Sequence, residues 1–281
     1  MKKILQILGS FIFIFLFQFN FLKSVIILVH GSPFEDKSWY QKETDFYKII
    51  EQCAKAIGQE VVGFEWGRCS VSLDCSSIIF AGSTLSFNIL SRISEGEKRI
   101  ILVGLGLGQE VIKVASQYLN FKKENCEIAC DSAEYEPINK RFNDLKVQRD
   151  SLLQLWRNKS DFFQRNFLIE TVINLGIQKS TLDNFPNLNF RFVADTNVIG
   201  LFYNIYSDNI LWQNFVGSEE LMTIGNEDDR VFDVHLDEIK GLVKKRSKSF
   251  CSFFRKKQDY KEIYLKNLAE LIFIISRDIH L

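Results

Sequence analysis

Short continuous apolar runs alternate with longer helical patterns along the first half of the chain. The short runs indicate strands buried on both faces, and they cover residues 24–31, 60–67 and 99–104. The segments between and after them repeat apolar residues at helical spacing, over 36–58, 75–93 and 109–121. Strands that alternate with helices predict an α/β fold, in which helices flank a mostly parallel central sheet on both faces.

The pattern changes after a short strand expected at 126–132. Residues 133–186 are charged and helical in pattern, with no strand signal, and we expect a helical insertion that caps the sheet or only packs against it. Two strand patterns return within 188–207, with a break near Asp195. Residues 230–236 are a last short strand or loop, before an amphipathic helix in 259–277. We therefore expect one α/β domain over 24–281, with 133–186 as its helical cap insertion.

The first 23 residues differ from the rest. Two lysines precede a nearly uncharged apolar run from Ile4 to Leu22, which is the pattern of a secretory signal peptide. The run is also about long enough to span a bilayer, so an N-terminal membrane anchor stays open, as does a place in the fold itself. Because a strand starts at Ser24 without a linker, we favour a cleaved signal. This predicts an exported protein, periplasmic or secreted, or one anchored in the membrane.

Three glycines lie at alternate positions in the turn after the third strand, in the sequence VGLGLGQ. Gly104 and Gly106 fit the first two places of the dinucleotide motif G-x-G-x-x-G, whereas its third place falls on Gln109. The spacing of Gly104, Gly106 and Gly108 also matches the nucleophile elbow G-x-S-x-G, with Gly106 in place of the serine. A nucleotide-binding loop over Gly104–Gly108 stays open as an alternative.

The first strand ends in VIILVHGS, a His-Gly turn of the kind that supplies one amide of an oxyanion hole. Together with the glycine motif and the chain order, it resembles the α/β-hydrolase fold family, in particular the lipase- and esterase-like members. The resemblance covers residues 24–120 well and 188–240 more loosely. It implies oxyanion-hole-like amides at Gly31, Ser32 and Leu107.

The family order of nucleophile, acid and histidine implies the remaining site residues. His235, in DVHLDEI, is the matching histidine, because the other histidine after Gly106, His280, is the penultimate residue. Asp208 follows a strand and is the first choice for the acid, with Asp195 as the second. Each has a structural alternative, as a turn or cap aspartate or as a histidine satisfied in the core.

Gly106 decides the function that we expect. Glycine has no side chain, so it cannot form the covalent intermediate of a serine hydrolase. We expect a catalytically defective lipase- or esterase-like protein that binds a small acyl or lipid ligand, or a partner, in a retained pocket. The alternative is a weak or unconventional hydrolase in which His235 and Asp208 activate water, or in which Ser32 or Ser83 enters the site.

Composition adds few constraints on partners and cofactors. Lys+Arg and Asp+Glu are 35 each, so the average charge does not favour nucleic acid. The six cysteines form no C-x-x-C pair and only three histidines are present, so we expect no metal and no cofactor. The segment 240–261 carries nine basic residues and three phenylalanines, which suits an anionic membrane surface or a solvated loop.

Overall fold

The structure is a computed structural model, and it describes residues 23–31, 40–56, 58–66, 75–120, 167–175, 192, 194–207, 230–238 and 266–276. The N-terminal segment 1–22, the strand expected at 126–132 and the basic segment 240–261 lie outside the described residues. None of the described helices is long and apolar enough to cross a membrane.

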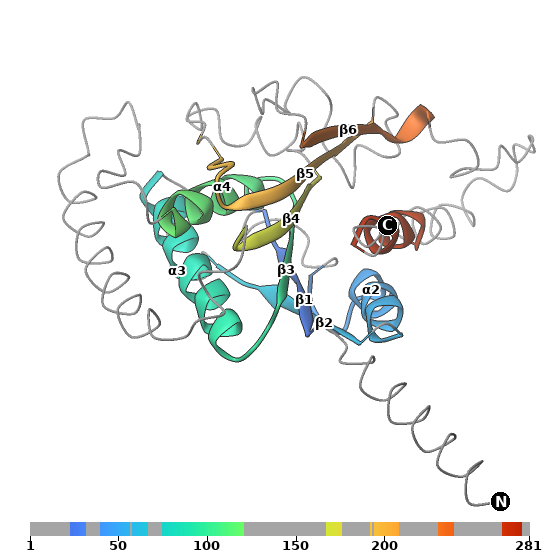
Figure 1. The fold of residues 1–281 in the computed structure, drawn as a ribbon. Coiled ribbons are helices and arrows are strands. Elements are labelled where there is room, and N and C mark those ends of the chain that lie inside the picture. The colour runs from blue at the N-terminus through green and yellow to red at the C-terminus, as the bar shows by residue number, and fades with distance from the viewer. Residues whose placement is uncertain are drawn as a thin grey trace, which may run out of the picture.

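Six parallel strands form the central sheet, in the order β2-β1-β3-β4-β5-β6 (Figure 1). They are β1 (Ser24–Val29), β2 (Gln59–Phe64), β3 (Arg99–Gly104), β4 (Ile169–Asn174), β5 (Ile199–Tyr206) and β6 (Val231–His235). Every residue of β1 and β3 is buried, as expected for apolar strands with helices on both sides. The prediction of an α/β fold with a mostly parallel sheet is confirmed.

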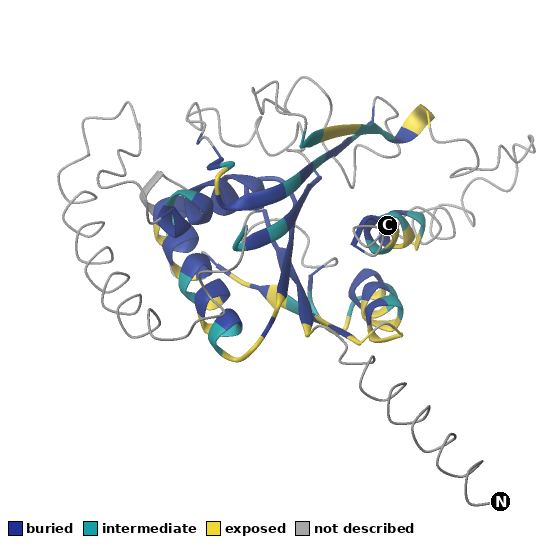
Figure 2. Cartoon of the chain, viewed as in Figure 1, coloured by how far each residue is buried: buried dark blue, intermediate teal, exposed yellow. Residues whose placement is uncertain are grey.

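Helices cover both faces of the sheet. The described helices are α2 (Asp45–Lys55), α3 (Cys75–Ser94), α4 (Gly108–Leu119) and a C-terminal helix at 266–276. On one face α2 and the C-terminal helix pack against residues such as Ile26 and Leu28, and on the other α3 and α4 pack against Ile27 and Leu102. This split follows from the strands, because successive side chains point to opposite faces. Figure 2 shows that the central strands and α4 are buried, whereas α2 exposes its outer side.

α2 starts later than the sequence pattern predicted, because Thr44 caps it. The hydroxyl of Thr44 accepts the N–H of Tyr47 at 3.3 Å. The buried Tyr47 hydroxyl donates to the carbonyl of Val61, which joins α2 to the edge strand β2. Burial raises the pKa of Tyr47 to about 12, and the carboxylates of Glu51 and Glu60 add to this shift.

The range expected as a helical cap contains a strand. β4 lies within the predicted cap, 133–186, and takes a central place in the sheet between β3 and β5. Its sequence, IETVIN, is six residues long and buried except at Glu170, so its pattern is too short to separate a buried strand from a buried helix. The prediction that 133–186 holds no strand is wrong, while most of the expected cap lies outside the described residues.

The approach to β5 also differs from the prediction. Phe192 and Ala194, in the first strand expected within 188–207, are not in a strand, and β5 begins at Ile199 after a turn. Asp195 stabilises this turn, because its carboxylate accepts the N–H of Asn197 at 3.1 Å. β6 lies within 230–236, where we expected a last short strand or a loop.

Candidate functional site

The turn between β3 and α4 is built from four residues, Leu105 to Gly108. The N–H of Gly108 donates to the carbonyl of Leu105 at 2.9 Å, which closes a β-turn. Gly106 has φ +56°, whereas Leu107 has φ −65° and ψ −14°. A positive φ at the first central position, followed by a helical second position, is the pattern of a type II′ turn, in which glycine is preferred first. Gly106 thus occupies the tip of a tight strand-to-helix turn, which we call the glycine turn.

Close packing requires glycine at position 108 and leaves little room for a larger residue at position 104. A Cβ on Gly108 would lie 2.3 Å from the carbonyl oxygen of Val29 and 2.8 Å from that of His30. A Cβ on Gly104 would lie 2.8 Å from Cδ1 of Ile112 on α4. The start of α4 therefore rests directly on the carboxyl end of β1, and a larger residue would push the two apart.

This contact lies where the path of the chain through the sheet reverses. From β1 the chain goes to one side, to β2, and from β3 it goes to the other side, to β4. In open α/β sheets, ligands bind at such a switch point, outside the carboxyl ends of the strands. Gly31 and the glycine turn both lie at this point, directly after β1 and β3. The topology therefore marks the region as the candidate binding site.

His30, directly after β1, belongs to the core. It is 1% exposed and stacks on Tyr40 and Trp66, with ring centroids 4.6 and 5.3 Å away. Its Nε2 accepts the backbone N–H of Trp66 at 2.7 Å, and its carbonyl accepts the indole N–H at 2.6 Å. Because Nε2 accepts, the neutral ring carries its proton on Nδ1. His30 holds the His-Gly turn in place.

Two of the three amides predicted for an oxyanion-hole-like site fall among the described residues. Gly31 and Leu107 are buried, and the N–H of neither has an acceptor in the described part of the chain. Buried N–H groups without an acceptor are rare, and ordered water or a ligand commonly supplies one. The third, Ser32, lies outside the described residues.

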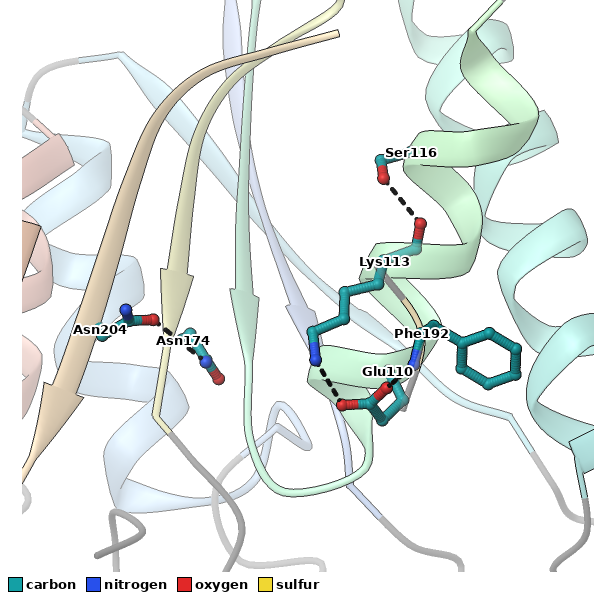
Figure 3. A network of polar contacts seen from close by, with 6 residues as sticks. All are labelled: Glu110, Lys113, Ser116, Asn174, Phe192 and Asn204. Atoms are coloured by element: carbon teal, nitrogen blue, oxygen red, sulfur yellow. Dashed lines mark hydrogen bonds and ion pairs between the residues drawn. The ribbon is translucent and has the colours of Figure 1, made fainter. Parts of the chain in front are cut away.

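A buried ion pair lies on the first turns of α4 (Figure 3). Nζ of Lys113 donates to Oε1 of Glu110 at 2.7 Å, and Oε2 of Glu110 accepts the N–H of Phe192 at 2.9 Å. Both charged side chains are only 4% exposed, so the segment through Phe192 contributes to covering the polar face of α4. Sequence reasoning missed this pair, because Glu and Lys three residues apart on a helix are usually a surface pair.

Three polar side chains form a row across the carboxyl ends of the last three strands. The Asn174 amide donates to Oδ1 of Asn204 at 3.3 Å, and the Asn204 amide donates to Oδ1 of Asp233 at 2.9 Å. The strand register pairs Gly104 with Asn174, so this row starts next to the glycine turn. Single asparagines within apolar strands carry no motif, and sequence reasoning did not select them.

His235 ends β6, and its ring lies against Tyr206 of β5 with a centroid separation of 5.1 Å. Its Nε2 lies 3.4 Å from Oδ2 of Asp237, and its Nδ1 lies 3.5 Å from Oε1 of Glu238. Both carboxylates belong to the short 3-10 helix η2 (Leu236–Glu238), which directly follows β6. Sequence reasoning missed these partners, although their spacing after the histidine, in HLDE, was a usable signal.

The sheet separates His235 from the glycine turn. β6 is the third strand from β3, so at about 4.8 Å per strand the two backbones stand about 14 Å apart. The His235 ring contacts β5, which still leaves about 10 Å to β3. A base acts on its nucleophile over about 3 Å, so the pairing of His235 with position 106 stays a prediction that requires the ring to move.

Of the two candidate acids, the structure describes only Asp195. Asp195 precedes β5, at the amino end of the sheet, and its carboxylate accepts the side-chain amide of Asn120 at 2.7 Å. Because His235 lies at the carboxyl end, about 25 Å along the strands, the second choice for the acid is wrong and Asp195 is a turn aspartate. Asp208 lies outside the described residues.

No protein-family model matches the chain, and no curated protein matches it significantly. Five solved chains are similar to it in structure. One of them is a lipase/esterase from Lactobacillus plantarum, with a TM-score of 0.35 and 12% sequence identity over 76% of this chain and 80% of that chain. A likeness at this level is weak, so the functional argument rests on the glycine turn and the residues around it.

No cluster of three or more His, Cys, Asp or Glu side chains within the described ranges could hold a metal ion. Cys53, on α2, is a half-buried free thiol, and burial raises its pKa, with a further rise from Glu270. The side chains of the other five cysteines lie outside the described residues.

Proposed function

We propose that this chain is a catalytically defective protein of the α/β-hydrolase fold, which binds a small acyl or lipid ligand at the glycine turn and does not hydrolyse it. The observation that carries the proposal is Gly106, which has a positive φ of +56° at the tip of the turn and no side chain with which to attack. The turn follows a buried strand, begins a helix and lies at the switch point of the sheet, as an elbow would.

Glycine at this position removes covalent catalysis. Loss of the nucleophilic serine costs about 10⁶-fold in turnover in the best-studied hydrolase, and leaves about 10³–10⁴-fold over water. That remainder corresponds to roughly 4–6 kcal/mol, less than the about 8 kcal/mol at the low end for enzymes. Glycine also avoids the strain of about 1–3 kcal/mol that a larger residue bears in this conformation. The turn is better suited to hold a ligand than to convert one.

The free amides favour a ligand with a carbonyl or carboxylate oxygen. The N–H groups of Gly31 and Leu107 lack acceptors in the described structure, and the N-terminus of α4 adds a partial positive charge. The side chains next to Gly106, Leu105 and Leu107, are packed into the cores on opposite faces of the sheet, so the ligand preference rests on the backbone amides. These features support an acyl ligand over a nucleotide, for which the third glycine of the motif would be needed at Gln109.

The alternative, a weak hydrolase that uses His235 and Asp208, has less support. His235 already lies within 3.5 Å of two carboxylates of its own turn, and its ring stands about two strand spacings from the turn that would receive the substrate. An activated water between His235 and a ligand would have to bridge that gap.

The test combines a binding assay with an activity probe on the full chain. We expect decanoate to raise the melting temperature, and a fluorophosphonate probe to label no serine. Leu107→Pro removes the N–H at a φ that proline accepts, so it should abolish the decanoate shift. Leu107→Ala loses the same side chain but keeps the N–H, and it should retain the shift.

Three results would oppose the proposal. Serine labelling that His235→Ala abolishes would establish a hydrolase. A melting shift with NAD but not with decanoate would establish the nucleotide-binding alternative. Equal decanoate shifts in Leu107→Pro and Leu107→Ala would remove the turn from the binding site.

A further inference from the structure

β6 lies at one edge of the sheet and is the most open of the described strands. β5 is its neighbour on one side, and no described strand lies on the other side (Figure 1). None of the five residues of β6 is buried, whereas each of the other described strands has buried residues. The Phe232 side chain is 41% exposed, and Figure 2 shows exposed residues along β6 in yellow. The edge is therefore accessible at Phe232 and Asp233.

The backbone of β6 carries unused hydrogen-bonding groups on its outer side. The carbonyl of Arg230 accepts the N–H of Phe202 on β5 at 2.9 Å. Backbone groups of successive strand residues point alternately to the two sides, so those of Phe232 also point toward β5, and those of Val231 and Asp233 point outward. These outward N–H and C=O groups have no partner in the described part of the chain. They form a short template for another strand.

The opposite edge of the sheet, β2, is protected. A Cβ on Gly63 would lie 2.5 Å from the carbonyl oxygen of Tyr40, so the chain before α2 packs closely against β2. β2 also carries a charge at Glu60, which pairs with Arg92 on α3. Proteins commonly protect edge strands with a covering segment, lysine or proline. The sequence of β6, VFDVH, holds neither lysine nor proline.

We propose that β6 pairs antiparallel with β6 of a second copy of this chain, around a two-fold axis at Phe232. Val231 of each copy then lies opposite Asp233 of the other, and each such pair exchanges two N–H···O bonds. The two Phe232 residues face each other in a non-hydrogen-bonded pair, in which side chains come closest. Each Phe232 ring already stacks on Tyr203 of β5 with centroids 5.1 Å apart, so an aromatic ladder crosses the axis. Two six-stranded sheets thereby join into one, and this does not depend on the proposed function.

The distribution of charge favours a second copy in this orientation. Arg230 directly precedes β6, whereas Asp237 and Glu238 follow it on η2. Antiparallel pairing brings these oppositely charged ends together, and parallel pairing would bring like charges together. Lys+Arg and Asp+Glu are 35 each in the whole chain, so two copies do not repel each other by net charge.

The other positions for the axis fit less well. An axis at Asp233 would set two carboxylates directly opposite each other, which is destabilising. An axis at Val234 would pair Phe232 with Leu236, which has left the strand for η2. An axis at either end of β6 would leave most of the strand unpaired. The strand is therefore complementary to itself around Phe232.

The first test is the mass of the full chain in solution, measured by light scattering during size-exclusion chromatography. We expect the mass of two copies. Val231→Pro removes an outward N–H that bonds to no described residue, and an edge strand tolerates proline at such a position, so this variant should elute as one copy. Val231→Ala loses the same side chain but keeps the N–H, and it should stay dimeric.

A second test reads the register by disulfide cross-linking under mild oxidation. In the proposed pairing the Cα atoms of the two residues at position 232 are about 4.5 Å apart, within the range that a disulfide bridges. Phe232→Cys should therefore link two copies. Val234→Cys is the control, because the two residues at position 234 lie about 14 Å apart along the strands and should not be linked. The linked peptides are identified by mass spectrometry, since the chain has six cysteines of its own.

The outcomes decide the inference without any ligand or activity measurement, so they leave the proposed function untouched. A natural chain that is monomeric at every concentration would overturn it and leave the edge to a strand of a different protein. A dimer that Val231→Pro and Val231→Ala preserve equally would place the interface elsewhere. Cross-linking through position 234 and not through 232 would contradict the axis at Phe232.

Discussion

The three glycines in and next to the glycine turn each have a different structural reason. Gly104 makes room for Ile112, Gly106 supplies a positive φ, and Gly108 allows α4 to touch the backbone of β1. The spacing of glycines in the sequence reveals such a turn, but it does not reveal which constraint each residue meets. That information depends on how close α4 comes to Val29, which is a property of the packed structure.

Gly108→Ala tests the close approach. The added Cβ would lie 2.3 Å from the carbonyl oxygen of Val29, a backbone atom that cannot move aside easily. We expect the free energy of unfolding in urea to fall by about 3 kcal/mol or more, as in severe overpacking. Gly96→Ala is the control, because Gly96 has φ +97° and no atom within 4 Å of an added Cβ. It should cost only about 1–2 kcal/mol, from backbone strain alone. Equal losses in the two variants would argue against a tight contact between α4 and β1.

At the scale of elements, α4 is unusual because nearly all of its residues are buried, including Gln109, Glu110, Lys113 and Ser116. Phe192 and residues 194–197 contribute to this burial through polar contacts. Phe192 binds Glu110, and the N–H of Asp195 donates to the hydroxyl of Ser116 at 2.8 Å. Phe192 and Asp195 thus lie against the helix shortly before β5 begins.

Lys113→Met tests the buried pair on α4. Removing one partner leaves the Glu110 carboxylate buried without its cation, so we expect a loss of about 3–5 kcal/mol in unfolding free energy. The double variant Glu110→Gln, Lys113→Met should recover most of this loss, because no buried charge remains. Lys266→Met is the control, since its pair with Glu270 is exposed and should be worth less than about 0.5 kcal/mol. A loss for Lys113→Met as small as that of the control would contradict the burial of the pair.

Elements were predictable from the sequence where the pattern was long or repeated. β1 and β3 were predictable because each is a continuous apolar run. α4 was predictable because its apolar residues recur at helical spacing. β4 was not, because six residues, five of them buried, next to a long helical pattern carry no period of their own. The sequence predicted the glycine turn and a late strand pattern that contains His235. It did not predict the contacts of Asp237 and Asn204, because these involve residues that come together only in the folded sheet.

At the scale of the whole molecule, Arg99 links distant parts of the chain at the amino end of the sheet. Its Nε lies 2.5 Å from Oε2 of Glu170 on β4, and its Nη2 donates to the carbonyl of Ser276 at 3.1 Å. Ser276 is the last residue of the described C-terminal helix, so one buried guanidinium joins β3, β4 and that helix.

Arg99→Met should loosen the C-terminal helix. We expect faster amide hydrogen exchange over 266–276 and a loss of about 2–4 kcal/mol in unfolding free energy, because the Ser276 carbonyl and Glu170 lose a buried charged partner. Arg92→Met is the matched control, since its pair with Glu60 is more exposed and should change stability by less than about 1 kcal/mol. Unchanged exchange over 266–276 would show that the helix is held by its apolar contacts alone.

The row of Asn174, Asn204 and Asp233 has a consequence for how the last strands align. These residues occupy matched positions on one face of the sheet, and each amide finds its partner only in that alignment. A slip of β5 by one residue would turn Asn204 to the opposite face, toward the apolar layer under the C-terminal helix, with its amide unpaired. Apolar side chains of similar size tolerate such slips far better than polar ones do. The row therefore specifies the register of β4, β5 and β6. It thereby fixes the position of the end of β6 and of His235.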